Sequence, residues 1–259
     1  MIKQLGGFLF DLDGVIFQGD TLIPGSKDML LELKHAGIPY RFITNTTRMT
    51  KNNLVKMLGD MGLAVDLNDV FSAPHAAAEY CELKGYNKIL LFVPDREMQD
   101  DFSAFQLVEN NPDAVVVGDM GALFTFGLLN KIFRFIIDGA ELVALHKNRY
   151  WAPAGGLALD LGAFISALEN ASNKSAAVMG KPNENLFKLA VRSWNVSKSS
   201  IYVVGDDLDG DICGAQNAGM KSILVKTGKF REESLENSKI VPDYIINSIA
   251  DLSGLIQLS

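Results

Sequence analysis

Two aspartates, Asp11 and Asp13, stand directly after a short apolar and aromatic run at residues 7–10. Such a run is typical of a buried strand, and Gly14 allows the backbone behind the two carboxylates to turn sharply. Like charges this close repel each other, so a cation beside them would be favourable. An acidic turn that only caps backbone N–H groups would show the same spacing. The pair alone leaves both interpretations open.

A second acidic cluster follows the apolar run at residues 201–204 and consists of Asp206, Asp207, Asp209 and Asp211. Carboxylates at a strand end, without histidine or cysteine nearby, favour Mg²⁺ over zinc or a redox metal. An acidic helix N-terminus, stabilised by the helix dipole, accounts for Asp209 but not easily for all four aspartates. The cluster therefore predicts a Mg²⁺ site.

Groups suited to a phosphate follow two further apolar runs. Thr44 and Asn45 end the run at residues 40–44, and Lys181 follows the run at residues 177–179. A hydroxyl and an amide can donate to phosphoryl oxygens, and lysine supplies a positive charge. Each residue alone is weak evidence, since Thr-Asn is common in turns and a lone lysine is usually a solvated surface residue. Together with the aspartates, they predict a phosphate-binding site.

Strand and helix patterns alternate along the segments that carry these residues. Apolar residues at helical spacing predict one helix capped by Ser26 and another capped by Thr50. Later helices are expected from about 184 to 194 and through Ala215. The expected strands are residues 7–10, 40–44, 177–179, 201–204, 222–225 and 244–246. This alternation predicts an α/β fold with a doubly wound, mostly parallel, Rossmann-like sheet, in which chemistry lies at the carboxyl ends of the strands.

The middle of the chain has a strand and helix pattern of its own. Strands are expected at residues 89–93, 114–117 and 142–145, and helices near 126–137 and 163–171. About a hundred residues suffice for a domain. We therefore predict a core domain of residues 1–74 and 176–259 and an inserted α/β domain of residues 75–175. Periodicity also allows one larger continuous sheet.

Composition narrows the class of partner. The 259 residues carry a net charge of −7 at a pI near 5.0, which disfavours nucleic acid and anionic membranes as partners. Apolar stretches are too short for a membrane span. Cys81 and Cys213 lie far apart, so neither a disulfide framework nor a zinc site is indicated, and no signal peptide is recognisable. We expect a cytoplasmic protein in which His35 and His75 bind no metal.

The order of the motifs resembles the haloacid dehalogenase superfamily. Its phosphatases carry an Asp-x-Asp motif, a Ser or Thr after a second strand, a Lys, and a Gly-Asp pair with a further Asp. The matching residues here are Asp11 and Asp13, Thr44, Lys181, and Asp206 and Asp211. The Thr-Asn-Thr-Thr run, the Gly-Lys-Pro run and the insertion are similar to subfamily IIA, which has a class II α/β cap domain. Residues 114–118, 145–150, 155–159 and 224–228 are similar to the phospholysine phosphohistidine inorganic pyrophosphate phosphatase group.

This resemblance implies a role for each matched residue. Asp11 would attack phosphorus and form an aspartyl-phosphate, and Asp13 would protonate the leaving oxygen and then activate water. Mg²⁺ would be held by Asp11, Asp206 and the backbone carbonyl of Asp13. Thr44, Asn45 and Lys181 would bind the phosphoryl oxygens. Asp211 and Asp207 would stand behind the metal site, with Asp211 positioning Lys181 or a water molecule.

The implied function is a Mg²⁺-dependent phosphatase acting on a small phosphorylated substrate. Phosphohistidine, phospholysine and inorganic pyrophosphate stay open as substrates, and a phosphomutase could share the core. A non-catalytic phosphate binder or a phospho-Asp signalling receiver is the alternative from another class. A receiver needs about half this length and no inserted domain.

The inserted segment offers groups for recognising the rest of the substrate. His146, Arg149, Tyr150 and Trp151 follow the expected strand at 142–145 and combine cations with aromatic faces. Arginine and aromatic residues are also enriched at protein interfaces. The stretch therefore predicts either substrate contact or packing, including a homodimer contact through the inserted domain.

Overall fold

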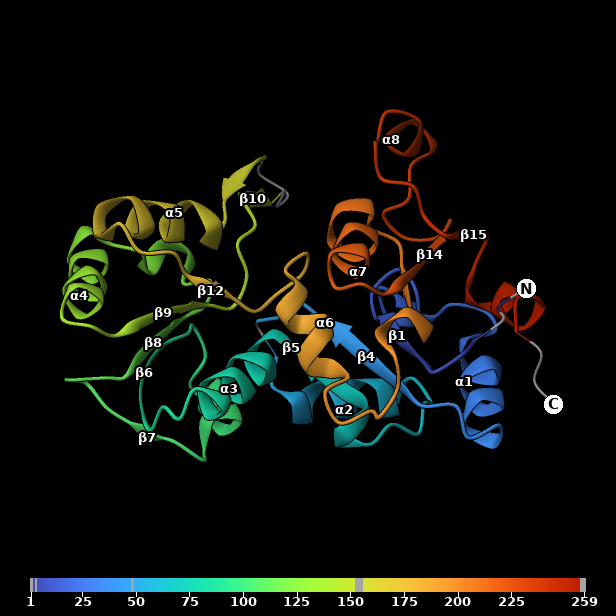
Figure 1. Cartoon of the computed structure of the whole chain (residues 1–259), viewed down its shortest axis with the longest axis horizontal. Coiled ribbons are helices and arrows are strands. Elements are labelled where there is room, and N and C mark those ends of the chain that lie inside the picture. The colour runs from blue at the N-terminus through green and yellow to red at the C-terminus, as the bar shows by residue number, and fades with distance from the viewer. Residues whose placement is uncertain (1, 3, 48, 152–155, 257–259) are drawn as a thin grey trace. The chain divides into compact units, whose positions relative to one another are not determined.

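The chain folds into two compact units in the computed structural model, which describes residues 2, 4–47, 49–151 and 156–256 (Figure 1). The core unit consists of residues 1–44, 52–71 and 181–259, and the inserted unit of residues 45–51 and 72–180. The sequence predicts the domain boundaries at 74/75 and 175/176, a few residues from the 71/72 and 180/181 boundaries found here.

A six-stranded sheet forms the centre of the core unit, with the strand order β15-β14-β13-β1-β4-β5. The strands are β1 (Gly7–Asp11), β4 (Tyr40–Thr44), β5 (Val70–Ser72), β13 (Ile201–Gly205), β14 (Lys221–Val225) and β15 (Tyr244–Ile246). Strand β1 pairs in parallel with β13 on one side and β4 on the other, and β14 and β15 continue the parallel pairing. The predicted doubly wound parallel sheet is confirmed.

The direction of winding reverses beside β1. The chain first adds β4 and β5 on one side of β1, and later adds β13, β14 and β15 on the other side. In open α/β sheets, ligands bind beyond the carboxyl ends of the strands at such a switch point. The fold thus brings the end of β1 next to the end of β13.

Aromatic packing fixes β1 in the core. Phe8 and Phe10 are fully buried, with ring centroids 5.5 Å apart, and Phe42 of β4 lies 6.4 Å from Phe10. The helical segments of the core unit are α1 (Ser26–His35), α2 (Lys51–Asp60), η1 (Leu67–Asp69), α6 (Glu184–Ala190), η4 (Lys198–Ser200), η5 (Leu208–Cys213), α7 (Gly214–Asn217), α8 (Glu232–Glu236) and η6 (Ile249–Gly254). A small hairpin, β2 (Phe17–Gln18) with β3 (Thr21–Leu22), follows β1.

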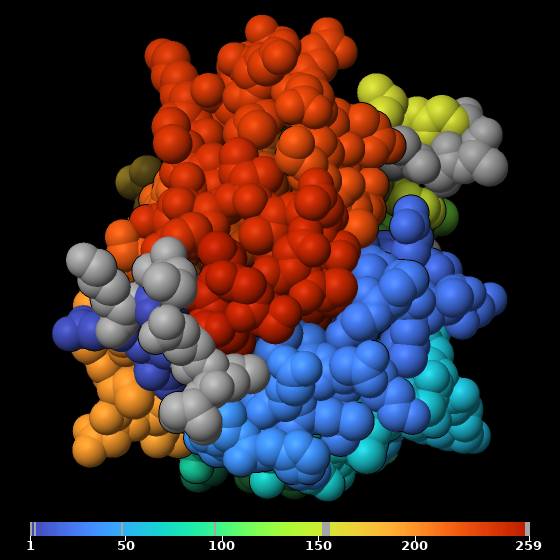
Figure 2. Space-filling model, turned by 90° about the vertical axis from the view of Figure 1, so that its right-hand side faces the viewer, coloured from blue at the N-terminus to red at the C-terminus, as the bar shows by residue number. Residues whose placement is uncertain are grey.

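The two ends of the chain meet within the core unit. Ile2 donates its N–H to the carbonyl of Leu255 at 2.9 Å, and Gly25, next to α1, packs closely against Ala250 of η6. Figure 2 shows this face, where the red C-terminal segment lies beside the blue N-terminal one. The helical segments α1 and η6 therefore pack together on this face of the core unit.

The inserted unit has a separate parallel sheet with the order β12-β9-β8-β6-β7. Its strands are β6 (Lys88–Phe92), β7 (Gln106–Leu107), β8 (Ala114–Val117), β9 (Glu141–Ala144) and β12 (Ala177–Val178), and its helical segments are α3 (Ala73–Leu83), η2 (Arg96–Phe102), η3 (Gly121–Leu123), α4 (Phe126–Ile137) and α5 (Leu161–Ser172). Figure 1 shows α4 and α5 on one side of these strands and α3 on the other. Two sheets replace the alternative of one continuous sheet.

Three local expectations were wrong. Ser26 does not cap α1: Gly25 does, in a left-handed conformation, and the Ser26 hydroxyl donates to the Ile16 carbonyl at 3.0 Å. Strand β12 was expected in the core sheet, but it pairs with β9 of the inserted unit. The helix expected over 184–194 ends at Ala190. The predicted helix through Ala215 is confirmed, because α7 contains this residue and directly follows the π-helix η5.

Within the described residues, no helix is long and apolar enough to cross a membrane.

Candidate active site

Asp11 ends β1 and turns its carboxylate into the buried end of the core sheet. The side chain is 7 % exposed, and its Oδ1 accepts the N–H of Leu12 at 2.8 Å. The same oxygen lies 2.7 Å from Nζ of Lys181. A carboxylate held by a backbone N–H and an ammonium has a fixed direction, as an attacking group requires.

Asp206 and Asp211 come from the neighbouring strand end. Asp206 directly follows β13, and Asp211 lies in η5; they are 2 % and 0 % exposed. One carboxylate oxygen from each of Asp11, Asp206 and Asp211 lies within 4.8 Å of the others. The parallel pairing of β1 with β13 therefore brings Asp11 close to Asp206 and Asp211, which are far from it in the sequence.

Lys181 is the buried cation of this cluster. Its Nζ lies 2.7 Å from Oδ1 of Asp11 and 2.7 Å from Oδ1 of Asp211. Burial alone would lower the pKa of Lys181, but the charges of Asp11 and Asp211 outweigh it and raise the pKa. The lysine stays charged at neutral pH.

Three buried carboxylates share this one ammonium, so the cluster carries excess negative charge. Burial raises the pKa of Asp206 to about 6, with the charge of Asp211 adding to it and the N–H of Lys229 opposing it. Burial likewise raises the pKa of Asp211 to about 6 and raises that of Asp11, against the attraction of Lys181. Paired buried charges are tolerated and unpaired ones are not. A further cation would restore the balance.

The donor atoms fit Mg²⁺. Within the described part of the chain, Oδ1 of Asp206 is buried and has no hydrogen-bond partner. The three acids offer hard oxygen ligands, which Mg²⁺ prefers. The residues present therefore suit the ion predicted from the sequence.

Asp207 and Asp13 lie beside this cluster rather than in it. Asp207 caps η5, where its Oδ1 accepts the N–H groups of Asp209 and Gly210 at 3.0 and 2.9 Å. Burial alone would raise the pKa of Asp207, but the Gly210 N–H and Lys229 outweigh this effect and lower the pKa. Asp13 is exposed and forms a bridge with Phe17. Asp13 is thus accessible to solvent two residues after Asp11.

The predicted phosphate donors Thr44 and Asn45 fall in different units. Thr44 ends β4 and is buried, and the neighbouring Ile43 is in register with Asp11. Asn45 belongs to the inserted unit, where its Oδ1 would lie 2.8 Å from a Cβ placed on Gly180. Thr44 is thus placed at the same sheet end as Asp11, whereas Asn45 packs against Gly180.

The predicted residues of the inserted unit separate into a buried and an exposed group. His146 is buried, with Nε2 3.8 Å from Oδ1 of Asp160. The exposed group lies along or next to the hairpin of β10 (Tyr150–Trp151) with β11 (Ala158–Leu159). There Tyr150 is 55 % exposed and the Arg149 guanidinium lies 5.9 Å from its ring centroid, while Trp151 is 40 % exposed. Arg149, Tyr150 and Trp151 are accessible to a ligand or another protein.

Sequence reasoning missed the loop that follows β14. The N–H of Lys229 donates to Oδ2 of Asp206 at 2.7 Å, and the Thr227 hydroxyl donates to the carbonyl of Gly14. The signal was present, because residues 227–229 follow a strand adjacent to β13 and so reach the same sheet end.

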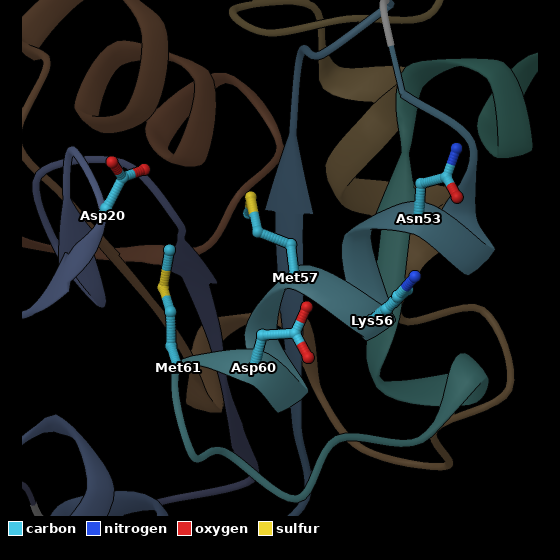
Figure 3. A pocket seen from close by; sticks show the side chains of 6 residues that line it. All are labelled: Asp20, Asn53, Lys56, Met57, Asp60 and Met61. Carbon is cyan, nitrogen blue, oxygen red and sulfur yellow. The ribbon is translucent and has the colours of Figure 1, made fainter.

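Two of the surface depressions that described residues line lie in the core unit. One is lined by Asp206, Asp207, Leu208, Asp209, Lys229, Phe230, Arg231, Ser234, Asn237 and Ser238 and so borders the acidic cluster. Figure 3 shows the other, which is lined by Asp20, by Asn53, Lys56, Met57 and Asp60 of α2, and by Met61, which directly follows α2. None of the predicted site residues lines the second depression.

Family models match two parts of the chain, and relatives match most of its length. Residues 8–106 match the haloacid dehalogenase-like hydrolase model, and residues 178–252 match a second model of the same family, HAD-hydrolase-like. Haloacid dehalogenase-like hydrolase domain-containing protein 2 of Bos taurus is 38% identical over 93% of this chain and 90% of its own. The chain belongs to the haloacid dehalogenase-like hydrolases.

Other relatives of this hydrolase carry phosphatase names. Human phospholysine phosphohistidine inorganic pyrophosphate phosphatase is 31% identical over 96% of this chain and 93% of its own. The crystal structure of 4-nitrophenylphosphatase from Thermotoga maritima has a TM-score of 0.87 at 29% identity and covers 98% of both chains. A glycerol phosphate phosphatase from Mycobacterium tuberculosis in complex with magnesium has a TM-score of 0.80 at 26% identity and covers 97% of this chain and 77% of its own. The predicted family and the assignment as a phosphatase are confirmed.

Proposed function

We propose that this hydrolase cleaves a phosphate ester of a small metabolite by forming an aspartyl-phosphate on Asp11, with Mg²⁺ as cofactor. The observation that supports it best is the buried cluster of Asp11, Asp206 and Asp211 around Lys181, with Oδ1 of Asp206 lacking a partner among the described residues. The relative crystallised with magnesium supports the same cofactor.

In the first step a carboxylate oxygen of Asp11 forms a bond to phosphorus as the bond to the leaving oxygen breaks. Asp13 gives a proton to that oxygen, which leaves as an alcohol. Water then attacks the same phosphorus, Asp13 takes its proton, and the bond between Asp11 and phosphorus breaks to release inorganic phosphate. The exposure of Asp13 suits both proton transfers.

The remaining groups are proposed to bind Mg²⁺ or the phosphoryl group and to balance the charges around them. Asp11, Asp206 and the carbonyl of Asp13 would hold Mg²⁺, whose charge, when bound, offsets that of the carboxylates and the phosphate. Lys181 and Thr44 hold phosphoryl oxygens, and Asn45 is proposed to join them. Asp211 keeps Lys181 in place through its 2.7 Å contact. Preorganised positive groups lower the barrier because they need no rearrangement during the reaction.

A second candidate substrate is a phosphorylated histidine or lysine, or inorganic pyrophosphate. The 31% identical human relative named for these substrates favours it.

We also propose a small-molecule partner, no nucleic acid or membrane partner, a homodimer through the inserted domain and a reducing cytoplasmic location. The last suits Cys81 and Cys213, which are both free thiols.

The covalent step is tested with Asp11→Asn. An amide is nearly isosteric with the carboxylate but is no nucleophile, so we expect kcat to fall by at least ~10³-fold with an unchanged circular dichroism spectrum. Rapid quenching of wild-type protein with a ³²P-labelled substrate should trap label on Asp11, and the variant should trap none. A variant that keeps more than a few per cent of the wild-type rate contradicts the covalent mechanism.

Release of inorganic phosphate in Mg²⁺ and in EDTA tests the cofactor and the reaction class. Activity should disappear in EDTA and return with excess Mg²⁺, and Asp206→Ala should need far more Mg²⁺. Full activity in EDTA would contradict the metal assignment. Transfer of the phosphoryl group to a second hydroxyl without phosphate release would indicate a phosphomutase, and binding without turnover would indicate a non-catalytic phosphate binder.

A further inference from the structure

Two glycines from different loops lie close to the carboxylate of Asp206. Gly14 follows β1 and Gly228 follows β14, and both have positive φ, +82° and +62°. A Cβ on Gly14 would lie 2.1 Å from Oδ2 of Asp206, and a Cβ on Gly228 would lie 2.0 Å from the same oxygen. Both distances are far below van der Waals contact. Oδ2 therefore occupies space that only two glycines leave free.

A third contact fixes the direction of this oxygen. The N–H of Lys229 donates to Oδ2 at 2.7 Å, and its side-chain Nζ lies 3.3 Å from Oδ2 of Asp207. A Cβ on Gly228 would also lie 2.6 Å from Cα of Gly14, and the Thr227 hydroxyl donates to the Gly14 carbonyl. The loop after β14 is thus tied to the loop after β1, with the Asp206 carboxylate between them.

We propose that the loop of residues 227–229 is a positioning element that holds Oδ2 of Asp206 so that Oδ1 is presented to the metal ion. This inference rests on the proposed function, because it assumes that Asp206 is a Mg²⁺ ligand. Oδ2 is occupied by the Lys229 N–H, whereas Oδ1 is buried without a hydrogen-bond partner in the described part of the chain. Partners of metal ligands commonly set metal affinity through such orientation.

Gly228→Ala and Gly219→Ala form a matched pair for the test. Gly219 also has positive φ, +76°, but no described atom lies within 4 Å of a Cβ placed there. Both variants therefore carry the left-handed strain of alanine, and only Gly228→Ala disturbs Asp206. Mn²⁺ binding without substrate, measured from the electron paramagnetic resonance signal of the free ion, reports metal affinity directly.

We expect the Kd for Mn²⁺ to rise by about tenfold or more in Gly228→Ala, the range typical of lost partners of metal ligands, and by less than about twofold in Gly219→Ala. Thermal melting in EDTA should show that both variants fold, with the larger loss in Gly228→Ala because its Cβ also meets Cα of Gly14. A wild-type Kd in folded Gly228→Ala, or equal weakening in both variants, would overturn the inference.

A hydroxyl pair keeps the inference testable should Gly228→Ala fail to fold. Thr227→Val removes the hydrogen bond to Gly14, whereas Thr227→Ser keeps it. The valine variant should weaken Mn²⁺ binding severalfold and the serine variant should not; equal Kd values would overturn the inference. Asp206→Ala distinguishes a failure of the proposed metal site from a failure of the inference about the loop of residues 227–229. If it binds Mn²⁺ as tightly as wild type, the proposed metal site fails and this inference fails with it, whereas normal binding in Gly228→Ala alone leaves the metal site intact.

Discussion

At the scale of single residues, the core unit confines three acids and one lysine in a buried space. Asp11, Asp206 and Asp211 are each less than a tenth exposed, and Lys181 contacts two of them. An apolar core would be more stable than such a cluster. The buried carboxylates therefore repel one another, and a bound cation would reduce this repulsion. Metal binding should for this reason raise the stability of the protein.

The metal-free protein should show the effect of these buried charges in its pH dependence. The pKa of Asp206 is raised from 3.8 to about 6, so the folded state binds the proton more tightly than the unfolded state. This contribution to stability is fully present below pH 3.8 and is lost as the pH rises through 6. In EDTA, the Tm of Asp206→Asn should therefore exceed that of wild type by a margin that grows from pH 5 to pH 7.

Calorimetry of both proteins across this range checks the prediction, and saturating Mg²⁺ serves as the control. The ion should raise the Tm of wild type far more than that of the variant. A constant Tm difference between pH 5 and pH 7 would contradict the raised pKa.

The residue types and their order were enough to predict which residues form the buried cluster, but not the contacts that each of them makes. Asp11, Lys181, Asp206 and Asp211 could be named because carboxylates and a lysine followed apolar runs. The contact of Lys181 with both Asp11 and Asp211 could not be predicted, because strand pairing between distant segments decides it. Lys229 was missed because it acts through its backbone N–H, which no residue type reveals.

At the scale of elements, Arg41 links β4 to two segments outside the sheet. Its Nε donates to the Asn68 carbonyl at 3.1 Å, and its Nη1 donates to the Ala190 carbonyl at the end of α6. The guanidinium carbon also lies 5.9 Å from the Phe71 ring centroid and 5.8 Å from that of Trp194. A planar group with several donors is needed for all four contacts.

Arg41→Lys should lower the free energy of unfolding by about 1–3 kcal/mol, because lysine keeps the charge but cannot reach both carbonyls. Urea unfolding measures this loss. Arg134→Lys, on the exposed side of α4, is the matched control and should change stability by less than about 0.5 kcal/mol. An equal effect of the two substitutions would show that Arg41 contributes only through its charge.

The sequence predicted the type of most elements but not always their sheet. Strand β12 was expected in the core because residues 177–179 precede Lys181, yet Ala177 and Val178 pair with Val143 and Ala144. An apolar run indicates a strand without showing which strand it pairs with. Ser26 was expected as a cap because serine is a common one, but a left-handed glycine beside it serves instead.

At the scale of the whole molecule, the proposed function assigns the phosphoryl group to residues of the core unit, so we expect selection among leaving groups to come from the inserted unit. Arg149 and Tyr150 are exposed there and lie 5.9 Å apart, measured from guanidinium carbon to ring centroid. Remote binding contacts of this kind raise kcat/KM for the substrate that makes them.

Arg149→Ala or Tyr150→Ala should lower kcat/KM for the best substrate from a screen of phosphorylated metabolites by about tenfold, on the order of 1.4 kcal/mol. Hydrolysis of p-nitrophenyl phosphate should hardly change. Phe126→Ala, which removes another exposed aromatic ring of the inserted unit, should leave both activities unchanged. Equal losses on both substrates, or a change from dimer to monomer in light scattering with both activities intact, would assign the stretch to folding or to a dimer contact.

The order of strands in the core sheet also governs what a nascent chain can form. Strand β1 leaves the ribosome first, but β13, its neighbour on one side, begins only at Ile201. By then the five strands of the larger sheet of the inserted unit, which all lie between residues 88 and 178, have been synthesised. Asp11 therefore lies in an incomplete sheet until Asp206 has been synthesised. Any chain released before that point lacks Asp206 and with it part of the proposed metal site.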